Sequence, residues 1–163
     1  MNFKINTIGV HISEYRARID QVLVHLFNDI LRIEEESLHR RGVHGLSMRE
    51  IHILQAIMES GEENTMSAVA ARLHVTVGSL TVAINTLVRK GYVERQRSSQ
   101  DKRCIHLLLT PRAADVNRLH QDFHRQLTDA LLREIPQERL ALICQGLDGV
   151  AAYFEEQERN GKL

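Results

Sequence analysis

The sequence predicts a mainly α-helical protein with one small β-hairpin. Apolar residues recur at spacings of three and four from about Ile19 to Arg41, which is the period of an amphipathic helix. Ser47 followed by Glu50 forms a capping box that begins a second helix. Residues 92–97 and 104–109 are rich in strand-forming side chains and flank a polar turn. We therefore expect a long helix, several short helices, a hairpin and two further helices.

The composition excludes several classes of protein. The chain has 163 residues, of which 43% are apolar and 26% charged, enough for one domain plus a dimerisation element. Two cysteines are too few for a disulfide scaffold and favour a reducing cytoplasm. No apolar run suits a signal peptide or a bilayer span, so we expect neither export nor a membrane partner. Because 21 cationic residues balance 21 anionic ones, a nucleic-acid partner would have to bind a local patch.

The centre of the chain predicts a helix-turn-helix. A short Ala-rich helix over residues 66–73 leads into a turn at 74–76. Thr76 can cap a fourth helix, which Gly91 ends in a left-handed conformation. Two short helices joined by a three-residue turn form a helix-turn-helix.

This fourth helix has one apolar and one polar face. At about 100° per residue, the apolar face carries Leu80, Ala83, Ile84 and Leu87, and the opposite face carries Gly78, Thr81, Val82, Asn85 and Arg89. Hydroxyl and amide groups can meet base edges in a major groove, and a glycine lets the backbone approach DNA. The polar face thus predicts a DNA-reading helix. The alternative is a plain solvated surface, where Glu and Lys are more common.

The hairpin is the basic part of the chain. Residues 76–103 contain six cationic and two anionic side chains. A basic hairpin after a DNA-reading helix predicts a wing whose loop reaches a minor groove. Asp101 would repel phosphate, so we expect it to pair with Arg97 or Arg103 and stabilise the wing. The alternative is a solvated surface turn. The residues predicted to contact DNA are Thr76, Gly78, Ser79, Thr81, Val82, Asn85, Arg89, Lys90, Arg95, Arg97, Ser98, Ser99, Lys102 and Arg103.

These motifs resemble the MarR family of winged helix-turn-helix transcription regulators. The sequence LVRKGYVER (87–95) on leaving the fourth helix and DKR (101–103) in the wing carry the resemblance, which extends from about Ile19 onward. Within the family, the chain is most similar to the FabT-like branch, repressors of bacterial fatty-acid synthesis genes. The resemblance implies a DNA-binding winged domain over residues 46–110. Residues 1–15 fall outside it and are expected to be either an N-terminal extension or the result of a misassigned start.

The remaining helices predict a dimerisation region over residues 16–45 and 111–163. Apolar stripes follow a helix that starts at Pro111 and a last helix that starts at Pro136. With the first helix, they offer more apolar surface than a small winged core covers, so we expect a homodimer. A twofold dimer implies palindromic double-stranded DNA.

The FabT-like branch also implies a ligand. Such repressors are understood to use acyl-acyl carrier protein as corepressor, so no other cofactor is expected. The residues predicted to line an apolar acyl pocket are Leu23, Leu26, Phe27, Ile30, Ile53, Leu54, Ile57, Leu119 and Phe123. The alternative is that they fill the core. Arg40, Arg41 and Arg49 are candidates to bind the acidic carrier.

Zinc is the alternative effector. His120 and His124 have the spacing to share an ion, with His39, His44 or Glu35 as further candidate ligands. A hydrogen-bonded packing role for His120 is the simpler interpretation, and we interpret the acidic run at 34–36 as a solvated helix face.

Neither cysteine lies in the first helix, where thiol-sensing relatives carry their reactive cysteine, and Cys144 is expected to pack. Because no nucleophile lies beside a base and no glycine-rich phosphate loop occurs, catalysis is not expected.

A second class of function is a winged helix that binds another protein. Such a surface would expose aromatic or leucine side chains. On the polar face of the fourth helix Val82 alone is apolar, and it suits a thymine methyl group. The sequence therefore favours a DNA-binding repressor.

Overall fold

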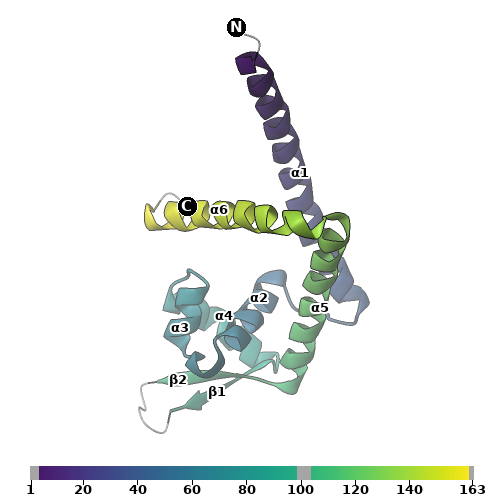
Figure 1. Cartoon of the computed structure of the whole chain (residues 1–163). Helices are drawn as coiled ribbons and strands as arrows, with labels where there is room; N and C mark the ends of the chain where they lie inside the picture. The colour runs from purple at the N-terminus through teal and green to yellow at the C-terminus, as the bar shows by residue number, and fades with distance from the viewer. Residues whose placement is uncertain (1–3, 99–103, 162–163) are drawn as a thin grey trace. The chain divides into compact units, whose positions relative to one another are not determined.

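The computed structural model describes residues 4–98 and 104–161, which are mainly helical with one two-stranded sheet (Figure 1). This confirms the predicted fold class. The chain divides into two compact units, residues 1–121 and 122–163. Among the described residues, no single helix is both long and apolar enough to cross a membrane, and the one helix pair that passes by length and composition, at residues 66–72 and 77–89, is bent by 107°.

The first unit contains α1 (Lys4–Arg40), α2 (Met48–Glu59), the 3-10 helix η1 (Gly61–Glu63), α3 (Met66–Arg72), α4 (Val77–Arg89), β1 (Val93–Arg97), β2 (Ile105–Leu109) and the start of α5 (Pro111–Glu134). The second unit contains the end of α5, η2 (Gln137–Arg139) and α6 (Leu140–Arg159). The first helix was predicted to begin near Ile19. It begins at Lys4, so most of the predicted N-terminal extension continues α1.

The predicted helix ends are confirmed by their caps. Ser47 Oγ accepts from the Glu50 amide at 3.3 Å, and Glu50 Oε2 accepts from the Ser47 amide at 2.8 Å, which completes the capping box of α2. Thr76 Oγ1 accepts from the Ser79 amide at 3.1 Å at the start of α4. Gly91 follows α4 with φ +75°, a left-handed conformation that costs glycine no steric strain.

A single apolar core holds the first unit together. Its fully buried side chains come from α2, α3, α4 and both strands, and include Leu54, Val69, Ile84, Leu87 and Leu107. Each helix therefore buries one stripe and leaves the opposite face to solvent.

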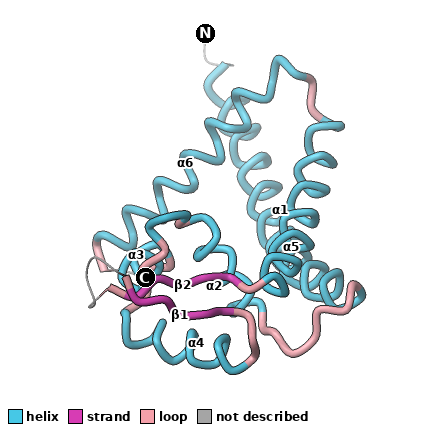
Figure 2. Tube along the Cα trace, turned by 90° about the horizontal axis from the view of Figure 1, so that it is seen from below, coloured by secondary structure: helices cyan, strands magenta, loops and turns pink. Residues whose placement is uncertain are grey.

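The strands form an antiparallel pair, which Figure 2 shows side by side. Val93 lies opposite Leu109 and Arg97 opposite Ile105. A third segment fixes the other edge of β2: Thr65 forms an isolated bridge with His106, and the Leu107 amide donates to the Asn64 carbonyl at 2.8 Å. The start of α3 is thereby tied to the base of the hairpin.

Buried polar groups join α1 and α2 to the first part of α5. Glu34 and His120 are each about 1% exposed, and Glu34 Oε1 lies 2.5 Å from His120 Nε2. Asn117 Nδ2 donates to the Leu54 carbonyl at 3.1 Å. The buried, paired role expected for His120 is confirmed, whereas the interpretation of residues 34–36 as a solvated face is wrong for Glu34. Its side chain points into the unit because α5 supplies a polar partner there.

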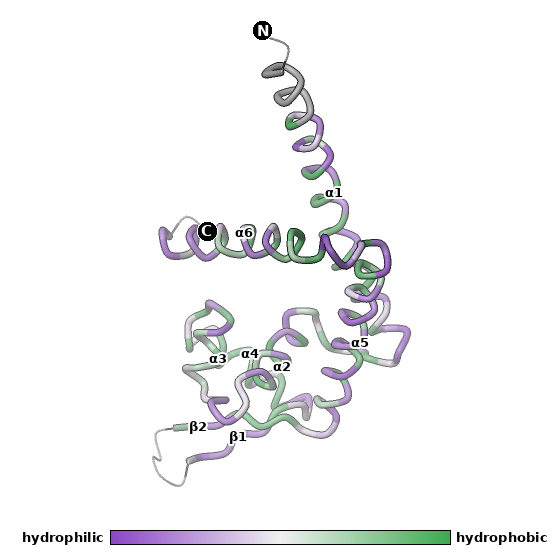
Figure 3. Tube along the Cα trace, in the orientation of Figure 1, coloured by the Kyte–Doolittle hydropathy of each residue, from purple (hydrophilic) through white to green (hydrophobic). Residues whose placement is uncertain are grey.

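Apolar side chains of the second unit remain exposed. Leu142, Leu147, Val150, Tyr153 and Phe154 of α6 are all exposed, and apolar stretches recur along this helix in Figure 3. Cys144 was predicted to pack but is also exposed. The reason is that α6 lacks, within its own unit, a cover for the whole of its apolar surface.

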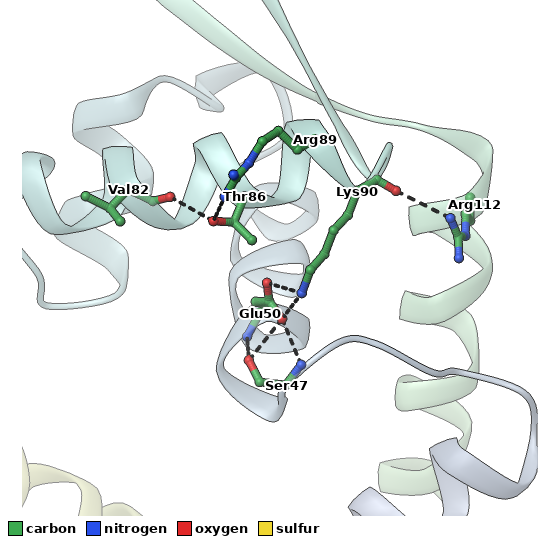
Figure 4. Close-up of polar contacts among 7 residues, drawn as sticks. All are labelled: Ser47, Glu50, Val82, Thr86, Arg89, Lys90 and Arg112. Atoms are coloured by element: carbon green, nitrogen blue, oxygen red, sulfur yellow. Dashed lines mark hydrogen bonds and ion pairs between the residues drawn. The ribbon is translucent and has the colours of Figure 1, made fainter.

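One carboxylate connects the start of α2 to the end of α4, as Figure 4 shows. Lys90 Nζ lies 2.7 Å from Glu50 Oε1 and 2.8 Å from Oε2, in addition to the bonds from Ser47. Burial raises the pKa of Glu50, but hydrogen bonds from Lys90 and Ser47 outweigh it, so the pKa lies below the ordinary value of 4.5. The ionised carboxylate thus stabilises the folded chain.

We expect Glu50→Gln to lower the free energy of unfolding by about 1–2 kcal/mol at neutral pH, because it weakens both the cap and the ion pair. Since the folded pKa is depressed, this stabilisation is complete above the unfolded pKa of about 4.3 and is lost as pH falls through the folded pKa. Urea denaturation of the unchanged protein and of the Glu50→Gln variant, at pH values from neutral to below the folded pKa, measures this loss of stability. Lys90→Met serves as the matched partner in a double-mutant cycle. Additive effects of the two substitutions would contradict the coupling.

Candidate nucleic-acid interface

The exposed end of the helix-turn-helix is the N-terminal half of α4. His74 has φ +52°, which turns the chain sharply between α3 and α4. Thr76, Val77, Gly78 and Ser79 are all exposed there. The first amides of a helix lack intrahelical acceptors and carry partial positive charge, so this end favours an anion such as a phosphate.

The two faces of α4 match the prediction. Leu80, Ile84 and Leu87 are buried, while Val82 is 69% exposed and Asn85 is exposed. Thr81 is half-buried, and its hydroxyl donates to the Val77 carbonyl at 2.7 Å, so its oxygen remains available only as an acceptor.

The sequence did not predict the exposure of two further valines on α4, nor one hydrogen bond along the helix. Val77 and Val88 are exposed in addition to Val82, although none of the three is aromatic. Arg89 Nη2 donates to Thr86 Oγ1 at 3.1 Å, which holds the guanidinium along the helix (Figure 4). A pattern of residue types predicts which face is exposed, but not these local bonds.

A hydrogen bond connects the polar face to the wing. Arg95 Nη2, from β1, donates to Asn85 Oδ1 at 2.8 Å. The bond fixes the orientation of the amide and leaves its NH₂ group as a donor. Arg95 and Arg97 are both exposed, as predicted for DNA contacts. No signal in the sequence could have found this pair, because it depends on how β1 crosses α4.

Lys90 has a different setting from the other predicted cations. Its ammonium group binds Glu50, and its carbonyl accepts from Arg112 Nη1 at 3.3 Å. The Arg112 guanidinium also lies 4.4 Å from the centre of the Tyr92 ring. The structure therefore assigns Lys90 a packing role at the end of α4, and its contact with phosphate stays a prediction.

The tip of the wing lies largely outside the described residues. Ser98 is half-buried, and its amide donates to the Cys104 carbonyl at 3.0 Å, which closes the described part of the hairpin. The predicted DNA contacts Ser99, Lys102 and Arg103, and the predicted wing-stabilising Asp101, all lie outside the described residues.

The predicted acyl pocket is divided between core and surface. Ile53, Leu54 and Ile57 are core residues, and Leu119 packs against them. Leu26 and Phe27 of α1 are exposed, Leu23 and Ile30 are half-buried, and Phe123 belongs to the second unit. The three α2 residues thus have the core-filling role that was the alternative, because the helix-turn-helix packs on them.

Among the candidate zinc ligands, His120 lies in the first unit beside Glu34, whereas His124 belongs to the second unit. The further candidates His39 and His44 lie elsewhere, with their Nδ1 atoms 3.3 Å apart and their rings edge to face. Glu35 is exposed.

Comparison with known proteins agrees with this geometry. Residues 44–103 match the model of the MarR family. The chain is 36% identical over 75 residues to the transcriptional regulator AdcR of Streptococcus pneumoniae, which covers 46% of this chain and 50% of AdcR. The chain spans about half the length of AdcR and of two other curated relatives that it matches.

Solved structures extend the match over most of the chain. The structure of Streptococcus pneumoniae FabT in complex with DNA aligns with a TM-score of 0.74 and 34% identity, over 86% of this chain and 98% of FabT. The MarR family transcription regulator SP03579 aligns with a TM-score of 0.73 over 92% of this chain and 97% of that protein, but at 15% identity it shows the fold alone. By fold, motif and sequence, the chain belongs to the MarR family of winged helix-turn-helix transcription regulators.

Proposed function

We propose that the protein is a homodimeric repressor that binds palindromic operator DNA and controls fatty-acid synthesis genes, with long-chain acyl-acyl carrier protein as corepressor. The observation that carries the DNA-binding part is the exposed face of α4, where Asn85 is held by Arg95 and the first turn of the same helix carries no bulky side chain. The likeness to FabT, which was solved with DNA, supports the same assignment.

The chemistry of this face suits base reading. An amide that presents NH₂ and carbonyl groups pairs with adenine through two hydrogen bonds, and each such pair discriminates by about 1–3 kcal/mol. In the free chain the Asn85 carbonyl is occupied by Arg95. Because an amide oxygen has two lone pairs, Asn85 could accept a hydrogen bond from adenine while Arg95 still holds it, and other N–H groups of Arg95 could donate to a phosphate. One residue would then position the protein while the other reads sequence.

Exposed apolar helices support the homodimer. Ile12, Tyr15, Ile19 and Val22 of α1 are exposed, as are the apolar residues of α6 described above. A monomer rarely leaves this much apolar surface in water, and a second copy offers the same surface in return. Two α4 helices related by a twofold axis would then address successive major grooves.

Two observations support an acyl-carrier corepressor. Ile12, Tyr15, Ile19 and Leu23 form an apolar stripe along α1 that is open to solvent in the single chain, next to Arg16 and Asp20. Arg40 and Arg49 are exposed cations that could meet an acidic carrier. The proposal for the acyl chain rests on the resemblance to FabT-like repressors, and these features are compatible with it.

The second candidate effector is zinc. Glu34 and His120 carry groups that bind zinc, but they contact each other directly at 2.5 Å, so an ion would have to displace this contact. A binding module for another protein remains a weaker candidate, because the exposed apolar side chains of α4 are valines and no aromatic residue accompanies them.

The DNA assignment predicts different effects for neighbouring residues. Asn85→Ala should abolish discrimination at one base position in each half-site, at a cost of about 1–3 kcal/mol there. Arg95→Ala should weaken binding to all sequences and reduce the salt dependence. The measurement is fluorescence anisotropy with a panel of single-base operator variants.

The matched control is Arg118→Ala, which removes an equal charge from the exposed surface of α5. It should leave both affinity and discrimination unchanged. The DNA assignment is wrong if Arg95→Ala binds DNA with the same affinity as Arg118→Ala, and Asn85→Ala keeps the same base discrimination as Arg118→Ala.

The corepressor proposal predicts that long-chain acyl carrier tightens operator binding by about tenfold to a hundredfold, which corresponds to about 1.4–2.7 kcal/mol of coupling. Linkage requires DNA to tighten binding of the acyl carrier by the same factor. Operator is titrated with protein in the presence of acylated carrier, of bare carrier and of zinc. Equal affinities with acylated and bare carrier would reject the corepressor, and a response to zinc alone would select the metal.

A further inference from the structure

Cys104 immediately precedes β2 and lies beside a histidine, contrary to the expectation that no nucleophile lies beside a base. Its Sγ is 3.9 Å from Nε2 of His106, and both side chains are half-buried. Alternate residues of a strand point to the same face, so the spacing of two residues brings the thiol and the imidazole together. The backbone holds them there, because His106 pairs with Thr65 and the adjacent Leu107 amide binds the Asn64 carbonyl.

A third residue orients the imidazole. His106 Nδ1 lies 2.7 Å from Asn64 Oδ1. An amide oxygen only accepts hydrogen bonds, so Nδ1 carries the proton and Nε2 presents its lone pair to the thiol. A thiol, an imidazole and an orienting amide in this order form a chain through which the histidine can take the thiol proton.

The thiol also opens onto a pocket. Cys104 lines a surface pocket of about 490 Å³ together with Met66, Ser67, Val77, Thr81 and Arg95. Arg95 supplies a cation, and hydroxyl groups supply further hydrogen-bonding partners. A cation in the pocket also attracts anionic reagents. Val77 and Thr81 belong to α4, so the pocket coincides with the proposed DNA-binding face.

We propose that Cys104 is a modification site that forms a mixed disulfide with a low-molecular-weight disulfide bearing carboxylates. His106 takes the proton of the thiol, and the thiolate attacks one sulfur of the reagent. The bond between the reagent's two sulfurs breaks as the new bond to Cys104 forms. The leaving thiolate is reduced and takes the proton from His106, while Cys104 is oxidised, so atoms and electrons balance.

The consequence for DNA rests on the proposed function. An adduct in this pocket would occupy the space between α4 and β1, place carboxylates beside Arg95 and repel phosphate. Modification would therefore release DNA, and reduction of the mixed disulfide would restore binding. The reactivity of Cys104 itself does not depend on this step.

The chain has a second cysteine, Cys144, which is exposed on α6 in the single chain and lies on the helix that the proposed homodimer covers, so each thiol is also compared with itself in denaturant. Cys144→Ser leaves only Cys104, and Cys104→Ser leaves only Cys144. Both full-length variants are treated with glutathione disulfide at neutral pH, and adduct formation is followed by mass spectrometry. We expect the less exposed Cys104 to react about tenfold faster than Cys144, and both thiols to react equally in denaturant. Equal rates in the folded proteins would overturn the proposal.

Two further variants test the role of the imidazole in the Cys144→Ser background. His106→Gln should slow adduct formation to the rate of Cys144, and Asn64→Ala, which keeps the imidazole but frees its orientation, should slow it by a smaller factor. Circular dichroism confirms that each variant folds. Unchanged rates in both folded variants would show that His106 does not activate the thiol.

The final arm measures DNA binding. The Cys104 adduct should bind operator at least about tenfold more weakly than the unmodified protein and recover with dithiothreitol. Undiminished binding by the Cys104 adduct would reject the regulatory step. If the unmodified protein fails to bind DNA, the proposed function fails, while the reaction rates still test the modification site.

Discussion

Glu50 joins the helix-turn-helix to α2 through a partly buried ion pair. Its carboxylate closes the capping box of α2 with Ser47 and accepts two hydrogen bonds from Lys90, the residue that ends α4. Because Lys90 also begins the turn into β1, the same ion pair sets where the wing leaves the helix. The position of the proposed reading surface relative to the core of the first unit therefore depends on a partly buried, charge-assisted contact.

Besides the Glu50–Lys90 ion pair, two sets of contacts position the proposed DNA-reading surface. Buried leucine and isoleucine side chains fix the rotation of α4, so Val82 and Asn85 must face outward. Arg95 then ties Asn85 to β1, and the Asn64–Thr65 segment ties β2 to the start of α3. Helix and wing thus form one pre-organised surface, which lowers the entropic cost of binding a rigid partner such as duplex DNA.

Local sequence rules predicted the parts of the fold that depend on neighbours along the chain. The caps at Ser47 and Thr76 and the left-handed Gly91 were predicted because capping needs residues within about four positions. The contacts of Glu50 with Lys90, and of Glu34 with His120, join residues far apart in sequence, and no periodicity encodes them. For the same reason the DNA face of α4 could be predicted from its composition, whereas the bond from Arg95 and the thiol pocket could not.

The central claim is that two copies of the α4 surface read a palindromic duplex, and selection from a random DNA pool tests it most directly. Duplexes retained by the purified protein are sequenced after several rounds. The account predicts an enriched inverted repeat whose half-sites lie about one helical turn apart, roughly 34–36 Å from centre to centre. A retained pool with no enriched sequence, or with a single unpaired half-site, would contradict it.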